Sequence, residues 1–361
     1  GLYLMAHVDA TAAPEMMALC GLLVAFSSAT QDVAIDAYRI EIAEERLQAA
    51  LAATYIFGYR LALLVAGAGA LYLAEFWSWQ VSYEVMAALV GVGALTVLIV
   101  REPSVNHFAA AQDIAHKIEN EAAKLTHLNP RVARLVGWFY AAVAGPFLDF
   151  FRRYKELALI ILLMVAVYRI SDIAMGVMAN PFYLDFMGFS KTQVADVTKI
   201  FGFFMTIAGS LVGGVMVVRY GVRRILLLGA IMTAATNLLF VVLAQYPPNI
   251  VTLAAVVSAD NLSGGIANVA LIAWLSSMTS ASFTATQYAL FSSLMTLPGK
   301  FIGGFSGIVV AGFGYAEFFL VAGIMGVPAI LLAIFMIRHG DRLDALAPRH
   351  ESKPDAEAVS S

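Results

Sequence analysis

Charged residues are scarce in this chain: only 13% of its 361 residues are Asp, Glu, Lys or Arg. Soluble domains carry about 25% charged residues, and a soluble fold could not cover the 61% of hydrophobic residues found here with so few charges. Cys20 is the single cysteine, so no disulfide framework can form within the chain. The net charge of −3 offers no basic excess for binding nucleic acid. The composition therefore predicts a polytopic membrane protein.

Apolar runs long enough to cross a bilayer recur along the chain. A hydrocarbon core of ~30 Å takes about 20 apolar residues per helix, and the alternating pattern of transmembrane barrel strands is absent. We therefore predict an all-α membrane protein with nine complete transmembrane helices, at 16–38, 49–75, 82–100, 156–185, 194–218, 223–244, 250–277, 285–312 and 316–337.

The sequence begins in an unusual way. Residues 1–6 look like the last turn of another apolar helix, and a short polar loop follows at 7–14. Neither an initiator Met nor a signal peptide precedes them. We interpret the chain as lacking N-terminal helices, with about nine helices of an original twelve or so.

The spans divide around one long polar connection. Within it, residues 108–127 suit a surface helix, and residues 129–155 favour an amphipathic helix in the membrane interface. We predict four parts: the remainder of an N-terminal helix bundle at 1–101, a cytoplasmic linker at 102–155, a six-helix bundle at 156–338 and a disordered cytoplasmic tail at 339–361.

The cations are confined to alternate connections. Because Lys and Arg accumulate in cytoplasmic loops, their distribution orients the chain. The opposite connections hold only Lys191, whereas the connections that we assign to the cytoplasm hold Arg39, Arg46, Arg101, Lys117, Lys124, Arg131, Arg134, Arg152, Arg153, Lys155, Arg219, Arg223, Arg224, Arg338, Arg342, Arg349 and Lys353.

Charged side chains inside the spans are costly and mark functional sites. Asp32 and Asp36 stand four residues apart, on one face of a helix. Repulsion between the two carboxylates favours a proton on one of them, as a proton-carrying site requires. In the alternative interpretation, Asp36 lies at the cytoplasmic end and pairs with Arg39 or Arg46.

The second half of the chain carries three more such groups. Arg169 and Asp172 are three residues apart and either neutralise each other or form a gating or binding pair. Asp260 belongs to a polar helix face with Asn261 and Ser263. Small and amide residues can serve packing alone, but packing does not explain the carboxylate of Asp260.

Two cations occupy similar positions in the two halves. Arg60 precedes Gly67 by the same spacing as Lys300 precedes Gly307. This fits a repeat in which each half offers one cation to a central cavity. The alternative is that both side chains snorkel to the membrane interface.

Several chemistries have no support in the sequence. No His, Cys or Asp cluster has the spacing of metal ligands, and no Walker loop, dinucleotide-binding fingerprint or nucleophile elbow is present. We therefore predict no metal, no cofactor and no catalytic residue, and a protein that is not an enzyme.

A loop at 214–224 resembles a conserved loop of the major facilitator superfamily. Its pattern has glycines for close helix approach and a tight turn, and cations that hold the loop against neighbouring helix ends. Val218 replaces the usual Asp. The positions that match are Gly214, Arg219, Gly221, Arg223 and Arg224.

Five further segments spread over most spans carry a pattern of their own, at 27–46, 58–75, 167–184, 260–278 and 282–294. They resemble the AmpG-type muropeptide permeases of Gram-negative bacteria. This resemblance implies a twelve-helix core of two halves, in which this chain starts near the end of the third helix. It also implies proton-driven import of N-acetylglucosaminyl-1,6-anhydro-N-acetylmuramyl peptides across the inner membrane, for peptidoglycan recycling. Acetyl-CoA-type solute carriers share parts of the patterns.

We thus predict a proton-coupled secondary transporter that works by alternating access. The substrate-binding candidates are Arg60, Arg169 and Lys300, with Tyr59, Tyr168 and Asn180 as neighbours, and the proton-coupling candidates are Asp32, Asp36, Asp172 and Asp260. The expected partners are an anionic muropeptide, protons and membrane lipids, and we expect a monomer in the bacterial inner membrane. The alternatives are a transporter of another anionic solute and a transporter-fold sensor that uses the linker.

Overall fold

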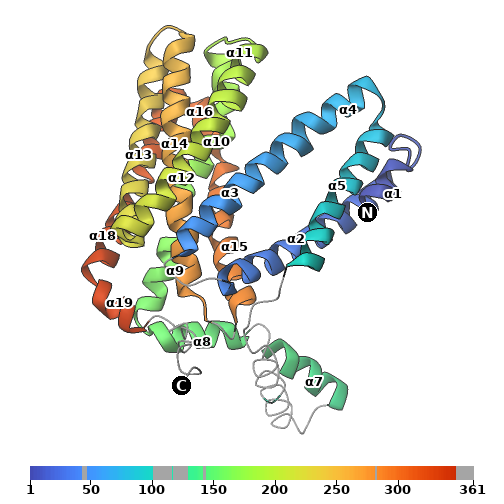
Figure 1. Ribbon diagram of the computed structural model, residues 1–361. Helices are drawn as coiled ribbons and strands as arrows, with labels where there is room; N and C mark the ends of the chain where they lie inside the picture. The colour runs from blue at the N-terminus through green and yellow to red at the C-terminus, as the bar shows by residue number, and fades with distance from the viewer. Residues whose placement is uncertain (43–46, 101–115, 117–128, 141–143, 281–282, 347–361) are drawn as a thin grey trace, which may run out of the picture. The chain divides into compact units, whose positions relative to one another are not determined.

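The structure is a computed structural model that describes residues 1–42, 47–100, 116, 129–140, 144–280 and 283–346 (Figure 1). Within these ranges, nine helical stretches are long and apolar enough to cross a membrane. Every predicted span coincides with one of them, and their ends differ by three residues or fewer. The nine stretches are Pro14–Glu41, Gln48–Phe76, Trp79–Ile99, Leu157–Phe186, Gln193–Tyr220, Val222–Gln245, Ile250–Met278, Thr284–Phe313 and Tyr315–Arg338.

The chain forms two compact units, which we describe separately. The first consists of residues 1–42 and 55–105, and the second of residues 43–54 and 106–361. In the first unit, α1 packs against α5 and α2, and α4 packs against α5. Its elements are α1 (Leu2–Ala6), α2 (Pro14–Glu41), α3 (Gln48–Leu64) from residue 55 onward, the π-helical turn η2 (Val65–Gly69), α4 (Ala70–Phe76) and α5 (Trp79–Ile99).

Local hydrogen bonds define the ends of these helices. Asp9 accepts bonds from Thr11 and from the amide of Ala12, and these bonds lower the pKa of the Asp9 carboxyl in the loop before α2. Ser78 caps α5 by accepting a bond from the amide of Val81 at 3.2 Å.

The second unit contains the start of α3 and the six remaining spans. Several spans consist of two or three consecutive helical pieces. The elements are α7 (Pro130–Phe139), α8 (Gly145–Tyr154), α9 (Leu157–Val167), α10 (Ile170–Pro181), η4 (Phe182–Phe186), α11 (Lys191–Ala195), η5 (Asp196–Phe201), α12 (Gly202–Tyr220), α13 (Val222–Gln245), α14 (Ile250–Met278), α15 (Thr284–Gly303), α16 (Ser306–Phe313), α17 (Tyr315–Ile324), α18 (Val327–Arg338) and α19 (Gly340–Leu346).

Helix α14 packs along both α12 and α13, and small residues make this close approach possible (Figure 1). A Cβ atom on Gly209 of α12 would lie 2.2 Å from the carbonyl oxygen of Leu262 on α14. A Cβ atom on Gly265 would lie 2.5 Å from the carbonyl oxygen of Thr206. Backbone contact of this kind favours association of transmembrane helices, so α12 and α14 form one tightly packed pair.

Tight turns join successive spans. Gly221 between α12 and α13 has φ +86°, and Gly314 between α16 and α17 has φ +91°, a conformation that glycine adopts without steric cost. Asn249 begins α14 by accepting a bond from the amide of Val251 at 2.8 Å.

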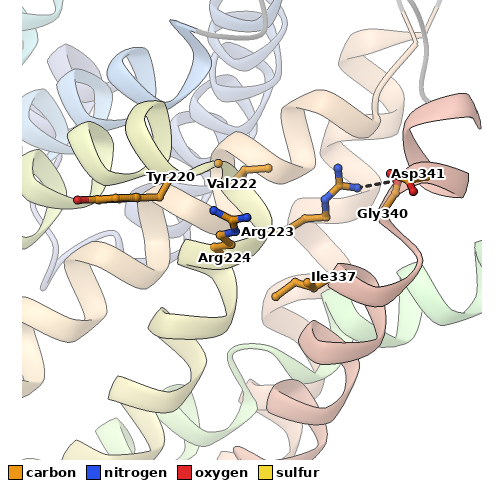
Figure 2. A pocket seen from close by; sticks show the side chains of 8 residues that line it. Tyr220, Val222, Arg223, Arg224, Ile337, Gly340 and Asp341 are labelled. Atoms are coloured by element: carbon orange, nitrogen blue, oxygen red, sulfur yellow. Dashed lines mark hydrogen bonds between the residues drawn. The ribbon is translucent and has the colours of Figure 1, made fainter.

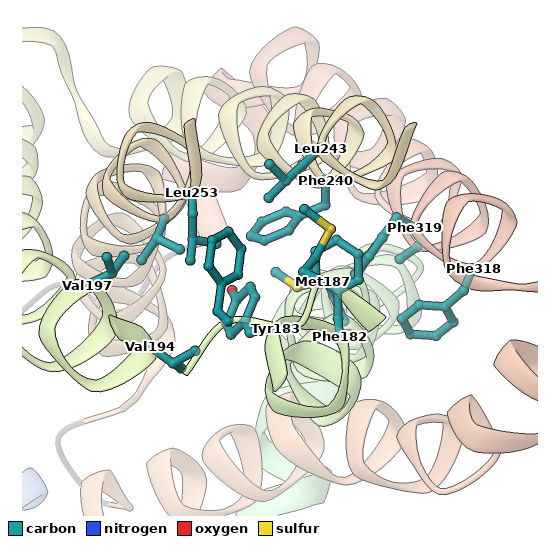
Figure 3. Close-up of a cluster of buried hydrophobic side chains, with 14 residues drawn as sticks. Phe182, Tyr183, Met187, Val194, Val197, Phe240, Leu243, Leu253, Phe318 and Phe319 are labelled. Carbon is teal, nitrogen blue, oxygen red and sulfur yellow. The ribbon is translucent and has the colours of Figure 1, made fainter. Parts of the chain in front are cut away.

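An aromatic cluster fills one end of the second unit, where η4, α13 and α17 meet (Figure 3). The rings of Phe182 and Phe319 cross at 4.8 Å in an edge-to-face arrangement, and Phe240 lies 5.3 Å from Phe319. These three side chains are fully buried. Close edge-to-face and van der Waals packing of these rings stabilises this end of the bundle.

The linker and the tail differ in part from expectation. Residues 129–155 form two helices, α7 and α8, where the sequence favours a single amphipathic helix. Residues 340–346, which the sequence assigns to the tail, form α19, and Arg223 binds both Gly340 and Asp344. Residues 347–361, and all of the predicted surface helix at 108–127 except residue 116, lie outside the described residues.

Candidate functional site

The first span of the second bundle is interrupted at its polar residues. Helix α9 ends at Val167 and α10 begins at Ile170. Arg169 between them has φ −107° and ψ 2°, which departs from helical geometry. Broken transmembrane helices place polar groups at solute sites in many transporters. The apolar run in the sequence does not predict this break.

Arg169 and Asp172 form an ion pair at the break. Nη2 of Arg169 lies 2.5 Å from Oδ2 of Asp172, and the two side chains are 26% and 27% exposed. Asp260 on α14 interacts electrostatically with Asp172. The cluster therefore contains two carboxylates and one guanidinium. When all three groups are ionised, it carries one uncompensated negative charge.

Helix α13 and the aromatic cluster surround Asp260. Oγ1 of Thr236 donates a hydrogen bond to Oδ1 of Asp260 at 3.2 Å, and the hydroxyl of Ser263 donates to the backbone oxygen of Asp260 at 2.8 Å. Tyr183, which lies in the aromatic cluster of Figure 3, is a further electrostatic neighbour. Asp260 is thus partly buried among polar groups, as a functional carboxylate at membrane depth requires.

Lys300 lies on the helix that adjoins this cluster. Gly299 of α15 packs so closely on α10 that its Cβ would lie 2.9 Å from Cβ of Ile173, the residue after Asp172. Lys300 itself is exposed and makes no ion pair with any residue that the structure describes. It therefore offers an available cation beside the charged part of α10.

Two predicted neighbours of the substrate occupy different environments. Asn180 is exposed near the end of α10. Tyr168 is buried, and its hydroxyl donates to the backbone oxygen of Leu226 on α13 at 2.9 Å. The hydroxyl of Tyr168 is therefore used inside the bundle, and a contact of its ring with substrate stays a prediction.

The first unit has its own carboxylate pair. Oδ1 of Asp36 lies 3.8 Å from Nε of buried Arg39, and the Arg39 guanidinium stands 5.8 Å from the centre of the Tyr55 ring. Asp32 is exposed and interacts electrostatically with Asp36 and Tyr55. Asp36 thus lies beside Arg39 and is also an electrostatic neighbour of Asp32. A role of the two carboxylates in carrying protons stays a prediction. Arg46 lies outside the described residues.

The second span of this unit carries Arg60 and Tyr59. Arg60 is partly buried and interacts with other groups, whereas Tyr59 is 56% exposed. Tyr59 also interacts electrostatically with Tyr55. Arg60 therefore lies on the same helix as the tyrosine that faces the Asp32 and Asp36 pair.

The predicted loop motif forms a pocket where α12 turns into α13 (Figure 2). Nη1 of Arg223 donates to the backbone oxygen of Gly340 at 3.0 Å, and Nη2 binds Asp344 at 2.5 Å. These bonds hold the turn against the start of α19. The pocket has a volume of about 490 Å³ and is lined by Tyr220, Gly221, Val222, Arg223, Arg224, Ile337, Gly340 and Asp341.

Two other positions of the motif make close contacts. A Cβ atom on Gly214 would lie 3.1 Å from Cβ of Ala53, in the part of α3 that belongs to the second unit. The Arg219 guanidinium stands 5.5 Å from the centre of the Tyr220 ring. The glycine thus permits close packing of α12 on the start of α3.

A third polar cluster joins α8 to the start of α15. Gln287 is 1% exposed. It donates to the backbone oxygen of Pro146 at 3.0 Å and to Asp149 at 2.9 Å, and it accepts a bond from the amide of Ser280 at 2.8 Å. Arg153 binds the same Asp149 carboxylate at 2.5 Å. We call this group the Gln287 cluster; it fixes α8 to the six-helix bundle.

Sequence reasoning missed several of these polar residues. Thr236 and Asn237 stand in an apolar run and carry no charge, whereas Ser171 and Gln287 belong to segments that we used only for their resemblance. A polar residue within a long apolar run is a signal that a buried partner exists, but the sequence does not identify that partner. Among the described residues, no group of three or more His, Cys, Asp or Glu could hold a metal ion.

Comparison with known proteins shows which family this chain belongs to. The sequence profile of the Major Facilitator Superfamily matches residues 157–359, more than half of the chain. The chain belongs to this superfamily. Among curated relatives, a transporter named AmpG 4 from Rickettsia conorii (strain ATCC VR-613 / Malish 7) is 31% identical over 317 residues, covering 87% of this chain and 71% of the relative. The chain is thus a member of the AmpG group of transporters.

Two further similarities extend the comparison. The anhydromuropeptide permease of Escherichia coli (strain K12) is 30% identical over 319 residues, which cover 88% of this chain and 59% of that protein. The solved structure of the proton:xylose symporter XylE, bound to 6-bromo-6-deoxy-D-glucose, has a TM-score of 0.58 and 16% identity, and the match covers 84% of this chain and 66% of that one. At this identity the likeness establishes the fold alone. The chain is therefore a multi-pass membrane transporter of the major facilitator fold.

Proposed function

We propose that this protein is a proton-coupled importer of anhydromuropeptides, acting in the bacterial inner membrane for peptidoglycan recycling. The observation that carries the proposal is the cluster of Arg169, Asp172 and Asp260 at a break in a transmembrane helix. The name of the Escherichia coli relative supplies the substrate class. The prevalence of cations in alternate loops supports a cytoplasmic tail and linker.

The charge balance of the cluster suggests how substrate and proton are coupled. Arg169 is the cation of the cluster and binds Asp172. A carboxylate of the peptide part of the substrate competes with Asp172 for Arg169, because a guanidinium forms charge-assisted hydrogen bonds with any carboxylate that reaches it. Asp172 without its cation lies near the charge of Asp260, so one of the two carboxylates takes up a proton. Substrate binding and proton binding then support each other.

The energy available for such coupling is modest. A membrane potential of 100 mV supplies about 2.3 kcal/mol per elementary charge. A change of one to two pKa units in a carboxylate between two conformations is worth about 1.4 kcal/mol per unit. The displacement of one ion-pair partner at membrane depth is therefore sufficient to connect the proton gradient to transport. Lys300, exposed on the neighbouring helix, provides a second binding group for an anionic substrate.

Uptake by purified protein in proteoliposomes tests the proposal. Labelled anhydromuropeptide is supplied outside, and a pH gradient is imposed with the acidic side outside. We expect accumulation that depends on the gradient and that unlabelled anhydromuropeptide suppresses. Free N-acetylglucosamine and free tripeptide serve as competitors that report which part of the substrate is recognised.

Matched variants make this test specific. Asp260→Asn should abolish accumulation driven by the pH gradient, whereas Asp185→Asn removes an exposed aspartate outside the cluster and should transport as the unmodified protein does. Uptake that ignores both the gradient and Asp260→Asn would refute proton coupling. Accumulation of coenzyme A thioesters, in place of muropeptides, would refute the proposed substrate.

A further inference from the structure

Helix α13 carries no charged group at the level of the cluster, yet two consecutive polar residues of α13 contact both helices that carry its carboxylates. Thr236 donates to Asp260 on α14. Nδ2 of Asn237 donates to Oγ of Ser171 on α10 at 2.5 Å, next to Asp172. Thr236 and Asn237 of α13 thus connect α14, which carries Asp260, with α10, which carries Asp172.

The hydrogen-bond chain at Asn237 has a defined direction. The hydroxyl of Ser171 donates its single proton to the backbone oxygen of Ala322 on α17 at 2.6 Å. Its oxygen must therefore accept a bond, so the amide of Asn237 faces it with the NH₂ group. Within the part of the chain that the structure describes, the carbonyl oxygen of Asn237 has no hydrogen-bond partner, although the side chain is fully buried.

A buried acceptor without a donor costs stability, because the hydrogen bond that it makes to water in the unfolded chain is lost and not replaced. An apolar side chain of similar shape would avoid this cost. The presence of Asn237 is therefore better explained by what its NH₂ group does to α10 than by a contribution to folding.

The position of Ser171 shows how the NH₂ group of Asn237 acts on α10. Ser171 lies in the first turn of α10, between Arg169 at the break and the following carboxylate Asp172. On the other side of the break, Tyr168 is tied to α13 through Leu226. The break is thus fixed to α13 on both sides, and Ser171 is also tied to α17.

We propose that Asn237 is a positioning residue of the transporter, which acts through Ser171 to hold Asp172 at a set separation from Asp260. This inference rests on the proposed function, because it takes the carboxylate cluster as the coupling site. Asn237 does not touch substrate. The separation matters because, among the described residues, the charged group that faces Asp260 is Asp172 on α10 with its partner Arg169. The phenol of Tyr183 approaches Asp260 from η4.

The test is the pH dependence of carbodiimide labelling at Asp260, measured by mass spectrometry on the purified full chain. Carbodiimides modify protonated carboxyl groups in apolar surroundings, so the midpoint of labelling reports the protonation of Asp260 without any substrate. We expect Asn237→Leu to shift this midpoint by about half a pH unit or more. Its melting temperature should stay equal or rise, since the orphaned oxygen is removed.

Two further variants control the experiment. Ser171→Ala should shift the midpoint in the same direction as Asn237→Leu, and the double variant should shift it no further, because both changes remove one interaction. Thr206→Val removes another buried hydrogen bond, from Thr206 to Asn261 at 2.9 Å, and should leave the midpoint unchanged.

The outcomes separate this inference from the proposed function. An unchanged midpoint in Asn237→Leu, or a fall in melting temperature without a shift, would overturn the positioning role. A wild-type protein that fails to accumulate muropeptide would instead overturn the proposed function, while the labelling midpoints would still report whether Asn237 sets the environment of Asp260.

Discussion

Individual side chains decide whether the helix break is a site or a packing defect. Arg169 and Asp172 neutralise each other within one span, which explains how both are tolerated at membrane depth. Asp260 has no cation of its own among the contacts of the described residues, and Thr236 is its side-chain donor. The unequal numbers of carboxylates and guanidinium groups are the reason why we propose that this cluster takes up protons.

The ion pair itself leads to a first prediction. Arg169→Gln removes the cation from two neighbouring carboxylates, and we expect at least about a tenfold loss of uptake, equivalent to about 1.4 kcal/mol. Lys300→Gln should raise the substrate concentration for half-maximal uptake and leave the maximal rate nearly unchanged, since Lys300 makes no ion pair with a described residue. Concentration series in proteoliposomes distinguish the two effects. Normal uptake by Arg169→Gln would exclude Arg169 from the site.

Among the helices, close backbone contact is concentrated where α12 crosses α14. Gly209 and Gly265 allow an approach that no other residue type permits, since their Cβ atoms would meet backbone atoms at 2.2 Å and 2.5 Å. Elsewhere in α14, Gly264 faces open space. Gly209 and Gly265 are therefore required for the close packing of α12 and α14, whereas Gly264 is not.

This difference gives a second prediction. Gly209→Ala should lower the free energy of unfolding by about 1–3 kcal/mol, because the added methyl group forces the helices apart. Gly264→Ala is the matched control and should leave the melting temperature equal or higher, because alanine is the better helix former. Thermal unfolding in detergent measures both. Equal melting temperatures for the two variants would contradict the crossing geometry.

The Gln287 cluster gives a third prediction, at the level of α8. Gln287→Leu removes the bonds to Pro146, Asp149 and Ser280 while keeping the side-chain size. We expect faster amide hydrogen exchange throughout α8, by about tenfold or more, since opening of α8 then costs about 1.4 kcal/mol less. Gln245→Leu, at an exposed glutamine at the end of α13, should leave exchange in α8 unchanged. Unaltered exchange in both variants would show that α8 is held by other contacts.

For the molecule as a whole, the distribution of cations predicts an orientation. In a chain whose only cysteine is replaced (Cys20→Ala), Pro247→Cys should react with an impermeant maleimide on intact spheroplasts. Asp341→Cys should react only after the membrane is opened. The reverse pattern would invert the orientation and place the pocket of Figure 2 outside the cell.

The sequence predicted the spans well because each span depends on local hydrophobicity and length. All nine predicted ranges coincide with helices of the structure. The charged residues Arg169, Asp172 and Asp260 also stood out by the cost of placing them in a membrane. The sequence did not predict the hydrogen bond from Tyr168 to Leu226, because a tyrosine near a charged pair is equally compatible with a substrate contact and with a buried bond inside the bundle.

The sequence by itself therefore determined the helical membrane class, the number and limits of the spans in the described residues, and the identity of the charged candidates. Only the tertiary structure decided which uncharged groups hold those candidates. Asn237 and Ser171 are 66 residues apart, and Gln287 and Asp149 are 138 residues apart. The hydrophobicity of a span is a property of its own residues and does not depend on which helix packs against it. A hydrogen bond needs a specific partner at a specific distance, which only the packed helices provide.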